Sequence, residues 1–203
     1  MIKELKKLAK RFDSKACSTI LDRKIPRGSG HYGEYYYMGK GLGLKVLREC
    51  YNSREGLLRS NGWELAKKEV ELLRLAKKSD LTPIPFKILP VEVSNEYWSP
   101  AILMEHIQGT LLVNYNKWEE HIKDSFCTAL QIVLLERTGL FHKDCAQHNV
   151  IVRKTRQGDV LFKMLDFTPD HVQWESNIVS RKTHAEELVK AYRKKCSNVA
   201  KLL

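Results

Sequence analysis

The sequence predicts an α+β protein of two small domains. Short apolar and aromatic runs separated by glycines dominate the first hundred residues, a pattern typical of antiparallel strands. Farther along the chain, apolar residues recur mainly at helical spacing. We therefore expect residues 1–104 to form a five-stranded antiparallel sheet with one main helix, residues 105–110 to connect the domains, and residues 111–203 to form a small, mostly helical domain.

The first domain is expected to begin with an amphipathic helix over residues 2–12, because apolar side chains recur there among lysines. Three strands are predicted to follow, at residues 18–21, 33–39 and 41–50. The middle one contains three consecutive tyrosines, which favour strands, and the glycines around it mark tight turns. Together these segments predict an antiparallel meander.

The main helix of this domain is predicted over residues 63–78, where apolar positions repeat every three or four residues. The prolines that follow cannot continue a helix. Two further strands are expected at residues 86–93 and 97–106.

The second domain should contain a helix over residues 118–137 that stops at Gly139, a residue suited to a left-handed cap. Two strands, 150–154 and 160–167, flank a polar stretch that suits a hairpin. A final helix is predicted over residues 183–202.

Composition limits the class of protein and of partner. The 203 residues are 43% hydrophobic, and no apolar run approaches the roughly 18 residues that a membrane span needs. The first residues lack the pattern of a signal peptide, so we expect a soluble, cytoplasmic protein, with a peripheral position at the inner face of a membrane left open. Five scattered cysteines favour reduced thiols. The net charge of +11 favours an anionic partner.

Gly28, Gly30 and Gly33 follow the pattern GxGxxG. Glycines let a backbone approach phosphate oxygens closely and direct its N–H groups at them. In a dinucleotide-binding fold this pattern opens a helix, whereas here a predicted strand follows it. The context therefore favours a hairpin that covers phosphates.

Lys45 lies in the next predicted strand, between Leu44 and Val46. Side chains alternate along a strand, so the lysine faces away from these two neighbours and is placed to contact a phosphate under the glycine hairpin. An ordinary exposed strand lysine is the alternative. Glu69 and Glu71 on the following helix are candidates to pair with it.

The most specific pattern is His142-Lys143-Asp144, with Asn149 five residues after the aspartate and Asp166-Phe167 after a predicted hairpin. An aspartate can accept the proton of an acceptor hydroxyl. An amide oxygen and a second carboxylate are the hard oxygen ligands that Mg²⁺ prefers. Polar residues that lie between apolar strands are costly to bury without a binding partner such as a metal ion or a substrate.

These motifs, in this order, make residues 25–170 resemble the protein-kinase-like superfamily. The resemblance implies a two-lobed fold that holds ATP and Mg²⁺ between the lobes, with residues 102–109 as the hinge. In the site that the resemblance implies, Lys45 contacts the α- and β-phosphates and Glu69 holds Lys45 in place, while Gly28, Gly30 and Gly33 cover the phosphates. Asp144 is the catalytic aspartate, Asn149 and Asp166 bind the metal, and His142 supports the loop. The adenine contacts the backbone of Glu105, His106 and Ile107.

The sequence also departs from typical protein kinases. Thr168-Pro169 replaces the glycine after Asp166-Phe167, and little chain remains for an activation segment or a peptide groove. Ala146 and His148 make the loop resemble that of lipopolysaccharide-core sugar kinases, and the short length resembles small Rio-like kinases and compact bacterial effector kinases.

Function is therefore expected to be ATP- and Mg²⁺-dependent phosphoryl transfer to a protein Ser/Thr hydroxyl or to a sugar or lipid-linked hydroxyl. The basic helices suit an acidic or membrane-associated acceptor. A nucleotide-binding pseudokinase that acts through a protein partner is the alternative. Binding of nucleic acid is not favoured, because no RNA-binding motif accompanies the charge.

Overall fold

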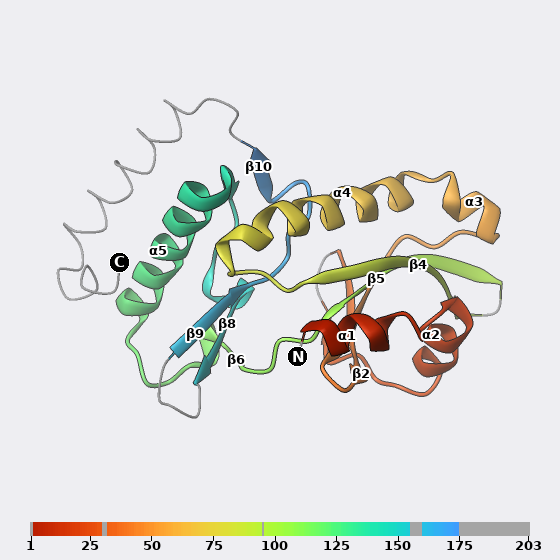
Figure 1. Ribbon diagram of the computed structural model, residues 1–203, viewed down its shortest axis with the longest axis horizontal. Coiled ribbons are helices and arrows are strands. Elements are labelled where there is room, and N and C mark those ends of the chain that lie inside the picture. Colours follow the sequence, from red (N-terminus) through yellow and green to blue (C-terminus); the bar gives the residue numbers. More distant parts are fainter. Residues whose placement is uncertain (1, 30–31, 95, 155–159, 175–203) are drawn as a thin grey trace. The chain divides into compact units, whose positions relative to one another are not determined.

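The computed structural model describes residues 2–29, 32–94, 96–154 and 160–174 (Figure 1). Contacts between Cα atoms divide the chain into two compact units. The first comprises Met1–Glu71 and Ile84–His106, and the second comprises Leu72–Pro83 and Ile107–Leu203. Residues 72–83, which the sequence analysis assigned to the first domain, thus belong to the second unit.

The first unit is built on a five-stranded antiparallel sheet with the strand order β1-β2-β3-β5-β4. The predicted α+β class and five-stranded antiparallel sheet are therefore confirmed. The strands are β1 (Gly28–Ser29), β2 (Gly33–Gly39), β3 (Leu42–Leu47), β4 (Pro85–Ser94) and β5 (Tyr97–Glu105).

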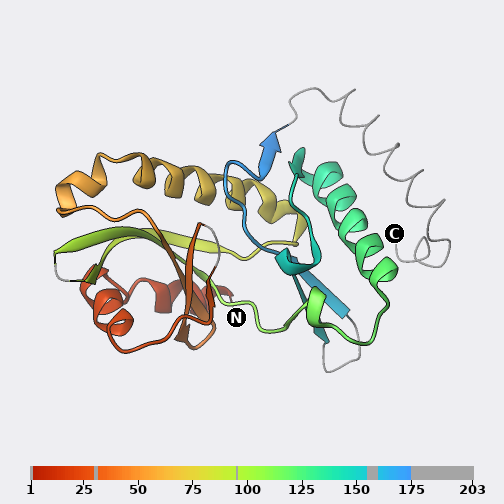
Figure 2. The ribbon, with the colours of Figure 1, turned by 180° about the vertical axis from the view of Figure 1, so that it is seen from behind.

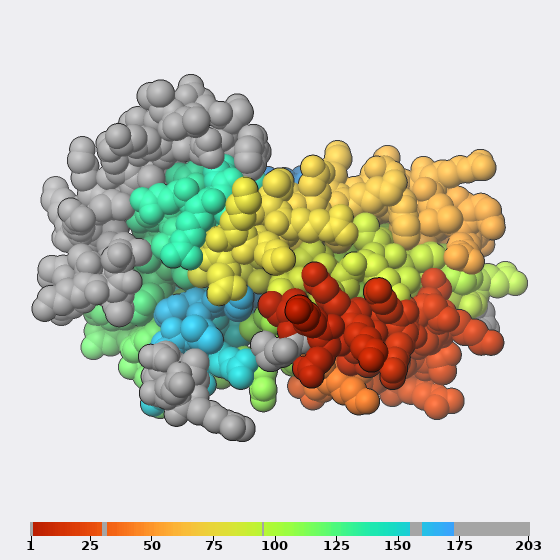
Figure 3. Space-filling view, in the orientation of Figure 1, coloured from red at the N-terminus to blue at the C-terminus, as the bar shows by residue number. Residues whose placement is uncertain are grey.

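Two short helices cover one face of this sheet, α1 (Ile2–Ala9) and α2 (Ser14–Leu21). Residues 61–71 of the longer α4 (Asn61–Ala76) belong to this unit and run along the other face, as both ribbon views show (Figures 1 and 2). In the space-filling view α1 and α2 form a continuous part of the surface of this unit (Figure 3). The core beneath them consists of buried apolar side chains from both helices and from alternate strand positions: Leu5, Ala9, Cys17, Tyr36, Met38, Leu42, Leu44, Val46, Leu89, Val91, Ala101 and Leu103.

The prediction of a strand at residues 18–21 is wrong, because these residues end α2. Asp13 caps this helix by accepting a hydrogen bond from the backbone N–H of Ala16 at 2.8 Å, and Cys17 is fully buried against the sheet. The cap and the one-sided burial outweigh the strand preference of Thr19 and Ile20. The fifth strand is instead β1, which directly precedes the glycine turn.

A second difference is α3 (Arg54–Leu58), a short helix that the sequence analysis did not predict. Ser53 caps it through a hydrogen bond from the N–H of Gly56 at 2.9 Å. Its buried residue is Leu57. The predicted main helix at 63–78 is confirmed as α4, followed by one turn of 3₁₀ helix, η1 (Lys77–Ser79).

The described part of the second unit combines one long helix, α5 (Glu120–Thr138), with two small antiparallel sheets. Gly139 ends α5 in the left-handed conformation, with φ of 76°, as predicted. The final helix expected at residues 183–202 lies outside the described residues. The remaining elements are β6 (Thr110–Leu111), η2 (Leu112–Asn114), β7 (Leu140–His142), η3 (Gln147–Asn149), β8 (Val150–Lys154), β9 (Val160–Met164) and β10 (Val172–Trp174).

The β8–β9 pair confirms the predicted hairpin, but β9 ends at Met164 and does not continue to residue 167. Asp166 has a positive φ of 58°, which an extended strand cannot accommodate. Residues 72–83 hold the end of β9, because the N–H of Met164 donates to the carbonyl of Leu81 at 2.6 Å. In the part of the chain described here, no helix is long and apolar enough to span a membrane.

Truncation of the buried Leu103 in β5 should be costly. Leu103 is fully buried, so we expect Leu103→Ala to lower the free energy of unfolding by about 3 kcal/mol. Leu65→Ala is the control, because Leu65 on α4 is 36% exposed and its truncation should cost less than about 1 kcal/mol. Urea unfolding measures both, and equal losses would contradict this assignment of the core.

Candidate functional site

Lys45 of β3 and Glu69 of α4 form an ion pair in the first unit. The Nζ atom of Lys45 lies 2.8 Å from Oε1 and 3.0 Å from Oε2 of Glu69. The lysine side chain is 14% exposed and the glutamate side chain 4%. Glu71, the other candidate partner, is exposed to solvent. The structure thus selects Glu69.

The pair lies on the face of the sheet opposite the α1–α2 core. Leu44 and Val46 point into that core, so Lys45 between them points to the other face. Residues directly opposite on neighbouring antiparallel strands share a face. Tyr35 pairs with Lys45, and Gly43 pairs with both Tyr37 and Met104. These residues therefore surround the lysine on one surface.

The glycine turn joins β1 to β2. Gly28 lies in β1, Gly33 begins β2, and Gly30 lies outside the described residues. A Cβ atom on Gly33 would lie 2.3 Å from the carbonyl oxygen of Val46, so only glycine allows this approach of β2 to β3. Arg48 of the segment after β3 donates a hydrogen bond to the hydroxyl of Ser29 at 2.7 Å.

The predicted hinge residues are divided between the units. Glu105 ends β5, and its N–H donates to the carbonyl of Ile84 at 2.9 Å. His106 donates its N–H to the carbonyl of Gly41 at 2.8 Å, which ties the end of β5 to the β2–β3 turn. Ile107 belongs to the second unit.

The second unit contains the loop that follows β7. His142 is fully buried there, and its Nε2 lies 3.0 Å from the carbonyl oxygen of Leu165. Its ring meets that of Phe167 edge to face, with centroids 5.0 Å apart. Burial lowers the pKa of His142 from its ordinary value of 6.5. A buried imidazole of this kind holds two backbone segments together.

Asp144 and Asn149 are joined through the side-chain amide. Nδ2 of Asn149 donates to the carbonyl of Asp144 at 2.9 Å and to its Oδ2 at 2.8 Å. Its backbone carbonyl accepts from the N–H of Leu165 at 2.7 Å, which connects the loop to the segment before Asp166. With Nδ2 used in this way, Oδ1 of Asn149 is the atom that remains as a ligand.

Asp166 joins this cluster through a residue that the sequence analysis missed, His171. The Nδ1 atom of His171 lies 3.1 Å from Oδ2 of Asp166 and 3.9 Å from Oδ2 of Asp144. The N–H of Lys143 donates to the carbonyl of His171 at 2.7 Å, and β10 pairs with β7 directly afterwards. We call Asp144, Asn149, Asp166 and His171 the loop cluster. No motif in the sequence predicts this contact of His171.

A metal site can be tested against these donors. In residues 2–29, 32–94, 96–154 and 160–174, no group of three or more His, Cys, Asp or Glu side chains is arranged to hold a metal ion. Mg²⁺ does not require such a cage, because one or two protein oxygens, substrate phosphates and water commonly complete its shell. Oδ1 of Asn149 and the carboxylate of Asp166 are donors of this kind. By the chemistry of their oxygen atoms, these two residues would suit a Mg²⁺ ion that binds together with a phosphate ligand.

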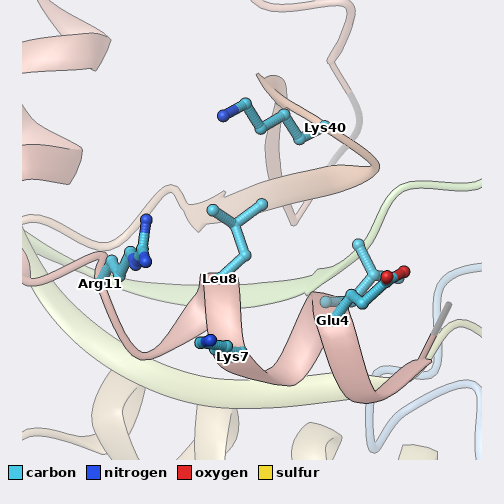
Figure 4. A pocket seen from close by; sticks show the side chains of 6 residues that line it. Glu4, Lys7, Leu8, Arg11 and Lys40 are labelled. Atoms are coloured by element: carbon cyan, nitrogen blue, oxygen red, sulfur yellow. The ribbon is translucent and has the colours of Figure 1, made fainter.

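A separate groove of about 410 Å³ lies at α1, and none of the residues predicted for the site lines it. Lys40, at the β2–β3 turn, lies opposite Leu8 across this groove (Figure 4). Its lining is a mixture of apolar, basic and acidic side chains: Glu4, Leu5, Lys7, Leu8, Arg11 and Lys40.

Comparison with known proteins does not assign a family. No protein-family model matches the chain, and a search of curated proteins returns no match.

Loss of one partner of the Lys45–Glu69 pair should destabilise the protein, because the other charge would remain buried. We expect Glu69→Ala to lower the free energy of unfolding by about 3 kcal/mol. The double variant Lys45→Met/Glu69→Leu should recover most of this loss, since it removes both charges. Glu64→Ala breaks an exposed pair with Lys67 and should cost less than about 1 kcal/mol. Urea unfolding compares the three, and similar losses for Glu64→Ala and Glu69→Ala would contradict the burial of the pair.

Acidification should destabilise the fold through His142. The pKa of His142 is lowered in the folded protein, whereas in the unfolded chain it is about 6.5. Below that pH the unfolded chain binds the proton more readily, so this contribution is fully present above about pH 6.5 and is lost as the pH falls toward the folded pKa. We expect His142→Gln to lose less thermal stability between pH 7.5 and 5.5 than the parent protein. The control is His121→Gln, whose side chain is 63% exposed, and an equal loss in all three proteins would contradict the prediction.

Proposed function

We propose that the chain is an ATP- and Mg²⁺-dependent phosphotransferase of the protein-kinase-like superfamily. The observation that carries the proposal is the buried Lys45–Glu69 pair. A lysine held by a carboxylate on a helix, one strand after a glycine turn, suits the contact with nucleotide phosphates that kinases make at this point of the sheet. An ion pair that served stability alone would gain little from this burial.

Sheet topology supports the same proposal. The glycine turn lies between β1 and β2, Lys45 is in β3, and α4 with Glu69 connects β3 to β4 and β5. This order of elements supports the proposal of a kinase-like nucleotide site. On this basis Gly28, Gly30 and Gly33 would cover the phosphates.

The loop cluster supplies the second set of groups that the reaction needs. Asp144 is the candidate catalytic aspartate, and its carboxylate is held by Nδ2 of Asn149 at 2.8 Å. Mg²⁺ bound by Asn149 and Asp166 would neutralise the phosphate charge. His142 positions the loop from within the core and does not contact substrate in this proposal.

In the proposed step, the acceptor oxygen forms a bond to the γ-phosphorus of ATP. The bond from that phosphorus to the β–γ bridging oxygen breaks, and ADP leaves. Asp144 orients the acceptor hydroxyl and takes its proton. We propose two candidate acceptors, a protein Ser/Thr hydroxyl and a sugar or lipid-linked hydroxyl. The net charge of +11 favours an acceptor that is acidic or membrane-associated.

The second candidate function is a nucleotide-binding regulator without turnover. For both candidate functions we propose a location in the cytoplasm. Two features favour it. Pro169 follows closely after Asp166, and proline restricts the backbone where kinases need a mobile glycine. The imidazole of His171 also lies 3.1 Å from the carboxylate that would bind the metal.

Asp144→Asn separates the two candidates. Because a positioned general base contributes at least about 100-fold, we expect this variant to lose about that much Mg²⁺-dependent turnover of radiolabelled ATP, measured as ADP and phosphorylated product. The control is Glu136→Gln, which makes the same charge change at an exposed position of α5. Equal rates in the parent and in Asp144→Asn would remove Asp144 from the mechanism. Nucleotide binding without turnover in every protein would favour the regulator.

A further inference from the structure

Tyr35 occupies an unusual position on the face of the sheet that carries Lys45. A Cβ atom placed on Gly43 would lie 1.8 Å from the hydroxyl oxygen of Tyr35 and 2.4 Å from its Cζ. The phenol of Tyr35 therefore rests where any side chain at position 43 would begin. Glycine at this position is what allows the tyrosine to lie there.

Two contacts hold the phenol in place. The hydroxyl of Tyr35 forms a hydrogen bond with Nδ1 of His106 at 2.9 Å, and the two rings stack with centroids 5.9 Å apart. His106 also contacts Tyr37, whose ring centroid lies 4.4 Å away. The guanidinium carbon of Arg27 lies 4.9 Å from the centroid of the Tyr37 ring and covers it.

Strand register places Gly43 between Lys45 and His106. Lys45 pairs with Ile102, and Gly43 pairs with Met104. His106 is the next alternate residue after Ile102 and Met104, so it follows Met104 on the same face of the sheet. Alternate residues of a strand share a face, which puts Lys45 and Gly43 on one surface. A ligand that reaches from the Lys45 ammonium to the backbone at Glu105 and His106 has to cross the α-carbon of Gly43, where the phenol lies.

We propose that Tyr35 is the gating residue of the nucleotide site. Its phenol fills the strip of sheet between Lys45 and His106, and a nucleoside gains access only when the phenol rotates away from Gly43. This inference rests on the proposed function, because it takes the ligand to be a nucleotide whose phosphates meet Lys45. The affinity of such a site is reduced by the fraction of molecules in which the phenol is in the closed position.

Calorimetric titration with a non-hydrolysable ATP analogue and Mg²⁺ tests the proposal. We expect Tyr35→Val to bind the analogue about tenfold more tightly than the parent, since the closed position no longer exists. Tyr35→Phe loses only the hydrogen bond to His106 and should bind about threefold more tightly. Gly43→Ala should act in the same direction as Tyr35→Val, because its Cβ displaces the phenol without removing it.

Two controls limit the interpretation. Tripolyphosphate can meet Lys45 without crossing Gly43, so its affinity should be the same in the parent and in Tyr35→Val. Tyr36→Phe removes a neighbouring hydroxyl that bonds to Glu34 and belongs to the opposite face, and it should leave binding of the analogue unchanged. Thermal melting of each variant verifies that it is folded.

Weaker binding of the analogue by Tyr35→Val would overturn the proposal, because Tyr35 would then be a stacking contact for the base. Unchanged binding, or an equal gain for tripolyphosphate, would overturn it as well. These outcomes differ from a failure of the proposed function. If Tyr35→Val binds the analogue more tightly and Lys45→Met weakens both ligands, but the parent protein shows no turnover, phosphoryl transfer fails while the gating role stands. If neither ligand binds to any variant, both proposals fall.

Discussion

A buried charge needs a partner, and this constraint organises the first unit. Lys45 interrupts an apolar strand in which Leu42, Leu44 and Val46 fill the core under α1 and α2. Its side chain is 14% exposed on the opposite face, so α4 has to present Glu69 there. The register of β3 and the rotation of α4 about its axis are thus coupled through one ion pair.

The loop cluster in the second unit is held differently, because its carboxylates are only partly buried: the side chain of Asp144 is 39% exposed and that of Asp166 24%. Its polar side chains come from the loop after β7 and from the segment after β9, which are separated in sequence by the β8–β9 hairpin. The buried His142 joins the two segments through the carbonyl of Leu165, and the backbone of Asn149 joins them again through the N–H of Leu165. Asp144 and Asp166 are therefore held on backbone that is fixed from within the core. Such support is what a site that binds phosphate and metal requires.

Tyr35 connects the packing of the sheet to its proposed chemistry. The same alternation that points Lys45 away from the core places Tyr35, Tyr37 and Gly43 on the face of the lysine. Gly43, two residues before the lysine, has no side chain, and the phenol of Tyr35 fills the space that a side chain would occupy. The surface that would receive a nucleotide is in this way covered by the protein itself.

The sequence by itself determined the elements that depend on local periodicity. The α4 and α5 helices, the Gly139 cap and the β8–β9 hairpin follow from spacing and turn residues, and the candidate site residues follow from motif order. Only the tertiary structure decided that residues 18–21 are helical, because burial of Cys17 against the sheet overrides strand preference. It also decided that Glu69 and not Glu71 meets Lys45, that His171 approaches Asp166, and that Tyr35 covers Gly43. These contacts depend on which faces of distant elements meet, and no local pattern in the chain carries that information.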